Sequence, residues 1–153
     1  MKLIIHGELP DLNTIIDAAK RGKGRWQPYN ELKRESTEAV AWPAKRLPKA
    51  SRVYLVITWY CKDKHKDPDN IAAAVKFIWD GLVAAGVIPN DGWKENAGWE
   101  NHFEVDKQNP RVEIDLMYLG GDSHGKATPM KVEPFYRQRP GGGEEHEAEK
   151  SDI

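Results

Sequence analysis

Residues 51–60, SRVYLVITWY, are dominated by β-branched and aromatic side chains, as is typical of a β-strand. Apolar residues occupy both of its alternating faces, which indicates a strand in the middle of a sheet with a neighbour on each side. We therefore predict a central strand here, and its partners must come from the sequence on either side.

The sequence before this strand predicts one short strand and two helices. Residues 2–6, KLIIH, have the composition of a strand, and glycine and proline soon end it. Residues 11–21 begin with Asp, a favoured helix cap, and predict a helix that stops at a pair of glycines. A second helix is expected over 28–42, with Pro28 in its first turn and Pro43 at the start of a basic loop.

The sequence after the central strand predicts one long helix and a hairpin. Apolar residues between 69 and 85 recur at steps of three, four and one, which is typical of a single amphipathic helix, and Gly86 marks its end. Two strands, about 97–107 and 111–119, are expected to pair as a hairpin around the turn at 108–110. This order of elements predicts an α/β (α+β) fold in which helices pack on a mixed β-sheet.

Composition indicates one domain. The chain has 153 residues, of which 39% are hydrophobic, enough for one core. We expect the domain to cover residues 1–119 and the glycine-rich, acidic residues 120–153 to form a largely disordered tail. The single cysteine, Cys61, excludes an internal disulfide, and no CxxC or close His pair suits zinc. With no apolar run near the ~20 residues that span a bilayer and no signal-peptide pattern, a cytoplasmic protein is expected.

The charge is divided between two parts of the domain, although the net charge is only −1. Residues 1–66 carry 14 Lys and Arg against 7 Asp and Glu, a net charge of +7, whereas residues 67–119 carry 4 against 10, a net charge of −6. A basic half suits contact with a polyanion, and an acidic part suits divalent cations. A solvated surface of mixed charge would show the same division.

Residues 67–70, DPDN, place two carboxylates one residue apart at the start of the predicted long helix. Asp at the N-cap and Pro in the first turn are favoured there, so helix capping explains one of the two aspartates. The second adds little to capping, and carboxylates are also the ligands that magnesium prefers. A calcium loop is excluded because Ile71 and Ala72 stand where that loop needs an oxygen ligand and a glycine.

Asp91 and Lys76 are the other candidates for this site. Asp91 lies in the turn after the long helix, so it reaches Asp67 and Asp69 only if the chain folds back along a helix of about 25 Å. An ordinary Asn-Asp-Gly turn is the alternative explanation for Asp91. Lys76 shares a helical stripe with Asp69 and Asp80, and it would either face a metal site or form an exposed i,i+4 pair with Asp80.

The run DPDNIAAAVKFIWDGLVAAGVIPNDG at residues 67–92, followed by RVEIDL at 111–116, resembles the RusA family of Holliday-junction resolvases. The resemblance covers residues 50–119 well and leaves the tail out. It combines D-x-D-N, an amphipathic helix with D-G-L and A-G-V, and an N-D turn, which together are more specific than D-x-D-N alone. The family lysine follows the second aspartate by four residues, where this chain has Ala73, and it matches Lys76 only when counted back from D-G-L.

The resemblance implies a homodimeric, mixed α/β nuclease that resolves branched DNA with magnesium, manganese being the alternative ion. Asp67, Asp69 and Asp91 would hold the metal and act in catalysis, and Lys76 would be a further catalytic residue about one turn further from the metal. A two-fold protein suits the paired nicks that resolve a four-way junction. The expected function is therefore a magnesium-dependent, structure-selective endodeoxyribonuclease of recombination and repair.

Basic and aromatic side chains supply the expected DNA contacts. Contacts to phosphates position DNA without reading its sequence, and solvation is the alternative explanation for each basic residue. Trp93 and Trp99, beside the turn, would either stack on bases or cover the core, and the core is the preferred interpretation. The residues assigned to DNA are Lys62, Lys64, Lys66, Arg21, Lys23 and Arg25.

Two other functions stay compatible with the sequence. The first is a protein of the same fold that binds branched DNA without cutting it, although the presence of all three aspartates argues against it. The second is a structural or interaction module in which the DPDN unit serves only as a helix cap. Removal of Asp91 would separate the module from the nuclease, because only the nuclease would lose metal affinity or activity.

Overall fold

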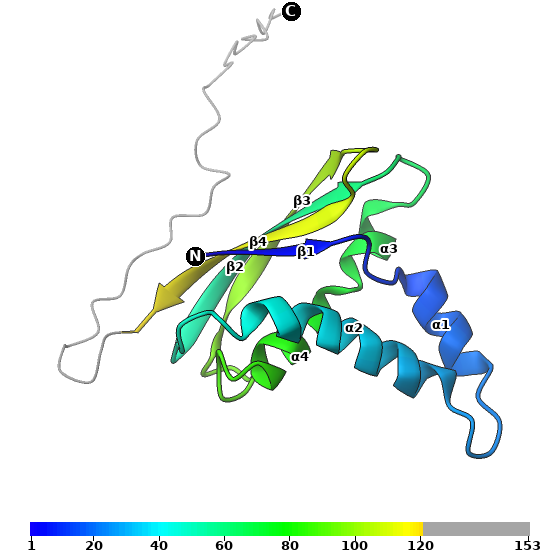
Figure 1. Ribbon diagram of the computed structural model, residues 1–153, viewed down its shortest axis with the longest axis horizontal. Helices are drawn as coiled ribbons and strands as arrows, with labels where there is room; N and C mark the ends of the chain where they lie inside the picture. Colours follow the sequence, from blue (N-terminus) through cyan, green and yellow to red (C-terminus); the bar gives the residue numbers. More distant parts are fainter. Residues whose placement is uncertain (121–153) are drawn as a thin grey trace, which may run out of the picture.

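A four-stranded mixed sheet with helices packed against one face forms the part of the chain that the computed structural model describes, residues 1–120 (Figure 1). This architecture confirms the predicted mixed class. The predicted tail lies outside the described residues from 121 onward. The elements are, in order, β1 (Lys2–His6), α1 (Leu12–Lys20), α2 (Pro28–Ala44), β2 (Arg52–Cys61), α3 (Pro68–Ala72), α4 (Val75–Ala84), β3 (Asn96–Val105) and β4 (Arg111–Leu119).

The strand order is β1-β4-β2-β3, so β2 is a central strand, as predicted. It pairs antiparallel with β4 on one side and parallel with β3 on the other. The predicted hairpin of β3 with β4 is wrong, because β2 lies between them. An apolar strand of ten residues is unfavourable at an exposed edge, and pairing on both sides satisfies its backbone groups.

One face of β2 is buried and the other is partly exposed. Val53, Leu55 and Ile57 are fully buried, whereas Tyr54 and Val56 on the other face keep contact with solvent. Both faces are apolar in composition, but the helices cover only one of them. The buried face contributes to a core whose other large members include Leu3, Ile5, Val40, Phe77, Ile78, Leu82, Ile88, Ile114 and Leu116.

Local signals set the ends of α1 and α2. A carboxylate oxygen of Asp11 accepts a hydrogen bond of 2.8 Å from the backbone N–H of Thr14 and so caps α1. α2 begins at Pro28, as predicted, but continues through Pro43 to Ala44, past the predicted end. Pro43 lies in the last turn, where a proline removes one hydrogen bond without interrupting a further turn.

The predicted single helix over 69–85 is two helices, α3 and α4, with a break at Ala73 and Ala74. The N–H of Ala74 bonds to the carbonyl of Ile71 at 3.3 Å, and the N–H of Phe77 bonds to that of Ala74 at 3.0 Å, which is a tighter, three-residue spacing. Alanine favours helices, so no local signal marks the break. Ala74 is fully buried, and the break lies where the chain enters the core.

None of the helices in residues 1–120 combines the length and the apolar character needed to cross a membrane. The helices pack on the sheet and on one another, and α2 and α4 approach each other closely at Gly81, the glycine of the D-G-L motif. A β-carbon added to Gly81 would lie 2.4 Å from the Cβ of Val40, far inside the optimal separation of nonbonded carbons. Glycine at this position therefore allows the two helices to meet.

Gly81→Ala is expected to lower the free energy of unfolding by about 1–3 kcal/mol, because the added methyl group overpacks the contact between α2 and α4. This cost exceeds the roughly 1 kcal/mol by which alanine is favoured over glycine in a helix. Urea denaturation followed by circular dichroism measures the change. Asn30→Ala, on the exposed side of α2, is the control for helix propensity. A Gly81→Ala protein as stable as the unmodified one would contradict the close packing.

Candidate functional site

Asp67 and Asp69 lie at the start of α3, just beyond the end of β2. Asp67 is the N-cap residue of α3, yet its side chain makes no capping hydrogen bond. Both residues are exposed, and within residues 1–120 neither carboxylate takes part in an ion pair. The DPDN unit thus has the position of a cap without the side-chain bond of a cap, which leaves both carboxylates available to a ligand.

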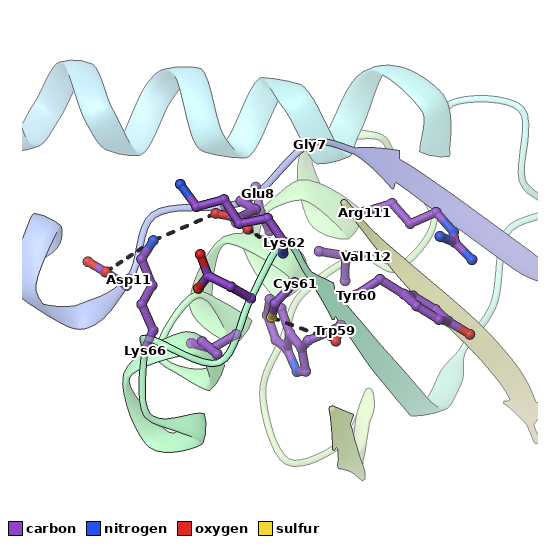
Figure 2. A pocket seen from close by; sticks show the side chains of 13 residues that line it. Gly7, Glu8, Asp11, Trp59, Tyr60, Cys61, Lys62, Lys66, Arg111 and Val112 are labelled. Atoms are coloured by element: carbon purple, nitrogen blue, oxygen red, sulfur yellow. Dashed lines mark hydrogen bonds and ion pairs between the residues drawn. The ribbon is translucent and has the colours of Figure 1, made fainter. Parts of the chain in front are cut away.

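Lys66 connects the segment before Asp67 to the loop between β1 and α1 (Figure 2). Its Nζ atom lies 3.3 Å from Oδ2 of Asp11 and 3.7 Å from Oε2 of Glu8. The backbone N–H of Lys62 also donates to Oε1 of Glu8, at 3.1 Å. These contacts position the segment that carries Asp67, and they give the Lys66 ammonium two carboxylate partners with which a phosphate would compete.

Asp11 and Cys61 line a pocket between the loop after β1 and the end of β2, and the pKa of each is shifted. The hydrogen bond from the backbone of Thr14 lowers the pKa of Asp11 below its ordinary value of 3.8, against the opposing effect of burial, and Lys66 lowers it further. Asp11 is therefore ionised both as a cap and as a partner of Lys66. Burial raises the pKa of the Cys61 thiol in the same pocket, so Cys61 is not a thiolate nucleophile at neutral pH.

The chain folds back after α4 and brings Asp91 toward the beginning of that helix. Gly86 has a φ of +76°, and the N–H of Val87 bonds to the carbonyl of Leu82 at 3.0 Å, which ends the helix and turns the chain. Oδ2 of Asp91 then lies 4.0 Å from Nζ of Lys76. The chain therefore folds back far enough to bring Asp91 to Lys76.

Lys76 is held between two carboxylates. Its Nζ atom lies 3.0 Å from Oδ1 of Asp80, one helical turn along, and 4.0 Å from Oδ2 of Asp91. The hydrogen bond to Asp80 raises the pKa of Lys76 above its ordinary value of 10.5, against the opposing effect of partial burial. Lys76 therefore stays protonated at neutral pH, so it can offset charge on a phosphate but cannot act as a general base.

Asp80 belongs to this cluster, although the sequence suggested only an exposed partner for Lys76. Its side chain is 17% exposed, and its Oδ2 atom is buried without a hydrogen-bond partner in the described part of the chain. A buried carboxylate oxygen without a partner is unfavourable. The i,i+4 spacing to Lys76 was the available sequence signal, but it does not indicate burial.

The sheet topology separates Asp91 from Asp67 and Asp69. Because β2 and β3 are parallel, residues that follow β2 and residues that precede β3 lie at opposite ends of β2. A strand of ten residues spans about 30 Å. Among residues 1–120, no three His, Cys, Asp or Glu side chains are placed to hold a metal ion together. The carboxylates have the right chemistry for magnesium, but this arrangement does not fit one ion held by all three aspartates.

An open cleft lies at the end of β2, beside Asp67. It has a volume of about 490 Å³ and extends from the start of α3 to the end of β3; we term it the Asp67 cleft. Its charged groups include Lys64 and Asp67, and Phe103 and Val105 provide an exposed apolar wall. Its volume is within the range of ligand sites, about 300–1,000 Å³.

A second open cleft lies at the other end of β2, beside Arg52. It has a volume of about 540 Å³ and is lined by Asp91 together with Trp93 and Trp99; we term it the Asp91 cleft. Trp93 is 98% exposed, so the preferred interpretation, that it covers the core, is wrong. Trp99 is 42% exposed and packs edge-on against the buried Trp79, with ring centroids 6.1 Å apart, so it covers the core in part.

The basic residues assigned to DNA fall into two separate groups. Figure 1 shows the connection between α1 and α2 at the tip of these helices, beyond the sheet, whereas the other group follows β2. All six residues are exposed, and their contact with phosphates stays a prediction. The group at the tip consists of Arg21, Lys23 and Arg25, and the group after β2 consists of Lys62, Lys64 and Lys66.

Asp11→Ala is expected to lower the free energy of unfolding at pH 7 by about 0.5–2 kcal/mol, because Asp11 caps α1 through its side chain. Asp67→Ala should have a smaller effect, because Asp67 makes no such bond. Urea denaturation of the two variants and of the unmodified protein measures both losses of unfolding free energy. An equal loss in both variants would contradict the structural difference between the two caps.

The effect of Asp11→Ala should also depend on pH. The pKa of Asp11 is lower in the folded protein than its ordinary value of 3.8, so its stabilisation is complete above that value and is lost as the pH falls through the folded pKa. The difference in stability between the unmodified protein and Asp11→Ala should therefore shrink below about pH 4. Denaturation curves at pH 7 and at pH 3 measure it, and a difference that grows at low pH would contradict the assignment.

Comparison of the sequence with known proteins gives no independent assignment. No protein-family model matches the chain, and no curated protein shows significant similarity to it. The resemblance to RusA resolvases therefore rests on residues 67–92 and 111–116 themselves.

Proposed function

We propose that the protein is a structure-selective endonuclease that cuts branched DNA, with magnesium as its cofactor and a homodimer as its active form. The observation that carries the proposal is the meeting of Lys76 with Asp91, which the turn after α4 brings within 4.0 Å. Both belong to the four residues that the resemblance to RusA resolvases marks as catalytic. Their approach from two different elements supports a common role.

Lys76 supplies a fixed positive charge at the proposed site. Cleavage of a phosphodiester concentrates negative charge on the phosphate in the transition state, and a cation already in place stabilises that charge. Asp80 accepts a hydrogen bond from Lys76 at 3.0 Å and so orients its ammonium group. In this proposal Lys76 is a catalytic residue and Asp80 is a positioning residue.

Asp67 and Asp69 are the proposed ligands of magnesium at the start of α3. Both are exposed, and Lys64, in the same cleft as Asp67, would meet the DNA backbone. The described arrangement does not gather these two aspartates with Asp91, so no step of the reaction is assigned to the metal.

The division of charge supports DNA as the substrate. The net charge of +7 over residues 1–66 suits the phosphate backbone, whose neutralisation dominates the affinity of proteins for DNA. A homodimer would present two sites with two-fold symmetry, which matches the symmetry of paired nicks across a four-way junction.

A protein that binds branched DNA without cutting it is the second candidate. The observation that favours it is the separation of Asp67 and Asp69 from Asp91 at opposite ends of β2, together with the absence of a three-ligand metal group within residues 1–120. Such a protein would use the same basic residues and would not need magnesium. The two candidates differ in one measurable property, which is cleavage.

The unmodified protein is expected to nick a labelled synthetic four-way junction at paired positions with magnesium, and to leave it intact without magnesium. A matched linear duplex should stay uncut. Asp69→Asn and Asp91→Asn should abolish nicking, and Lys76→Gln should slow it by about 100-fold or more because its positive charge is lost. Denaturing gel electrophoresis of the labelled strands measures the rates.

Asp115→Asn is the matched control, because Asp115 is an exposed carboxylate on β4 outside both clefts. Its nicking rate should equal that of the unmodified protein. Tight binding of the junction without cleavage by any of the proteins would establish the second candidate. If the unmodified protein binds no junction, both candidates fail and an interaction module is left.

A further inference from the structure

The Asp91 cleft presents a bare aromatic face next to a candidate catalytic residue. Trp93 and Asp91 line the same cleft. The Trp93 ring is 98% exposed, and among residues 1–120 no other ring and no cationic side chain stacks on it. A single exposed apolar side chain is common on protein surfaces. Trp93, however, lies in a cleft with Trp99 and Arg52, where its exposed ring can contact a flat ligand.

Trp93 is carried by a hydrogen-bonded turn. The N–H groups of Glu95 and Asn96 both donate to the carbonyl of Gly92, at 3.2 and 2.9 Å. The carbonyl of Glu95 accepts a hydrogen bond of 2.9 Å from the N–H of Val53, so the turn is attached to β2. Because the turn is closed and attached, the backbone at Trp93 is held in place before a ligand arrives, so only the side chain has to be ordered on binding.

Trp99 forms the second aromatic side of the cleft, and a β-bulge places it there. Asn96 pairs with Val53 and Trp99 pairs with Leu55, so β3 has one residue more than β2 between these pairs. Gly98 in this bulge has a φ of +117°, and an added β-carbon would lie 3.2 Å from the ring of Tyr54. Bulges redirect side chains and are frequent beside functional sites.

We infer that the Asp91 cleft binds an unpaired nucleobase of branched DNA, which stacks on the indole of Trp93. The inference rests on the proposed function, because it takes DNA as the ligand. Bases at a branch point are less constrained by pairing than bases in a duplex, and aromatic side chains bind unpaired bases by stacking with little dependence on sequence. The cleft thereby distinguishes branched DNA from linear duplex.

Arg52 is the cation that suits the phosphate of the same nucleotide. It lies in the Asp91 cleft, it is exposed, and it forms no ion pair within the described part of the chain. A guanidinium group binds phosphate through paired hydrogen bonds. Stacking on Trp93 and a phosphate contact at Arg52 would together hold one nucleotide beside Asp91.

The test measures binding in EDTA, so that it does not depend on cleavage. The probe is a fluorescently labelled four-way junction with two unpaired thymidines at the branch point, and the reference is a linear duplex of the same length. Trp93→Ala should weaken binding of the junction roughly 5- to 100-fold, the range expected for loss of one stacked base. Its affinity for the duplex should stay within about twofold, because paired bases cannot stack on the indole.

Two further variants make the result specific to stacking at this cleft. Trp93→Phe keeps an aromatic face and should retain most of the affinity for the junction. Trp42→Ala removes another exposed indole, 76% exposed on α2 with Lys45 over its ring, and should change nothing. Trp93→Ala should unfold at the same urea concentration as the unmodified protein, because the side chain it removes makes almost no contact with the domain.

Other outcomes overturn the inference in distinguishable ways. Equal affinities of Trp93→Ala and the unmodified protein for the junction would overturn the base site while leaving DNA as the ligand. If Trp93→Ala converts a dimer into a monomer in sedimentation experiments and the duplex and junction lose affinity equally, the cleft is an interface between copies. If the unmodified protein binds neither DNA, the proposed function fails and the base site fails with it.

Discussion

The parallel pairing of β2 with β3 determines how the helices and the candidate residues are arranged around the sheet. Parallel neighbours need a crossover connection, and α3 and α4 supply it. The buried face of β2 and the apolar side chains of α4 meet at the centre of the core. The same pairing places the DPDN unit at one end of β2 and the turn with Asp91 at the other. The topology that buries the core therefore also places Asp67 and Asp91 in two different clefts.

Periodicity in the sequence predicts the elements of this fold but not their pairing. The strand at 51–60 and the helix capped by Asp11 follow from local backbone preferences, and both are found. The hairpin prediction fails because the turn at 108–110 does not determine the partner of β4. The same turn signal is expected whether β4 pairs with β3 or lies on the other side of β2. The break at Ala73 lies next to Ala74, which is buried in the core. A run of alanines favours an unbroken helix, so the sequence does not predict this break.

The candidate site is predictable in its residue types and only partly in its contacts. Helical spacing alone pairs Lys76 with Asp80, and the glycine after α4 permits the reversal that brings Asp91 to them. The partners of Lys66 come from the loop after β1, far away in the sequence. The exposure of Trp93 depends on how a turn is attached to β2. The partners of Lys66 and the exposure of Trp93 depend on the three-dimensional arrangement, so no local sequence pattern predicts them.

The position of Lys76 between Asp80 and Asp91 has a consequence for how ions bind. An anion that approaches the Lys76 ammonium must compete with Asp91, and a cation that approaches Asp91 must compete with Lys76. Each ligand thus removes the competitor of the other. Two ligands linked in this way bind more tightly together than separately, and each raises the affinity for the other by the same factor. A phosphate oxygen at Lys76 and a cation at Asp91, if they bound together, would replace the 4.0 Å contact between these two side chains, while Asp80 would keep its 3.0 Å hydrogen bond to Lys76.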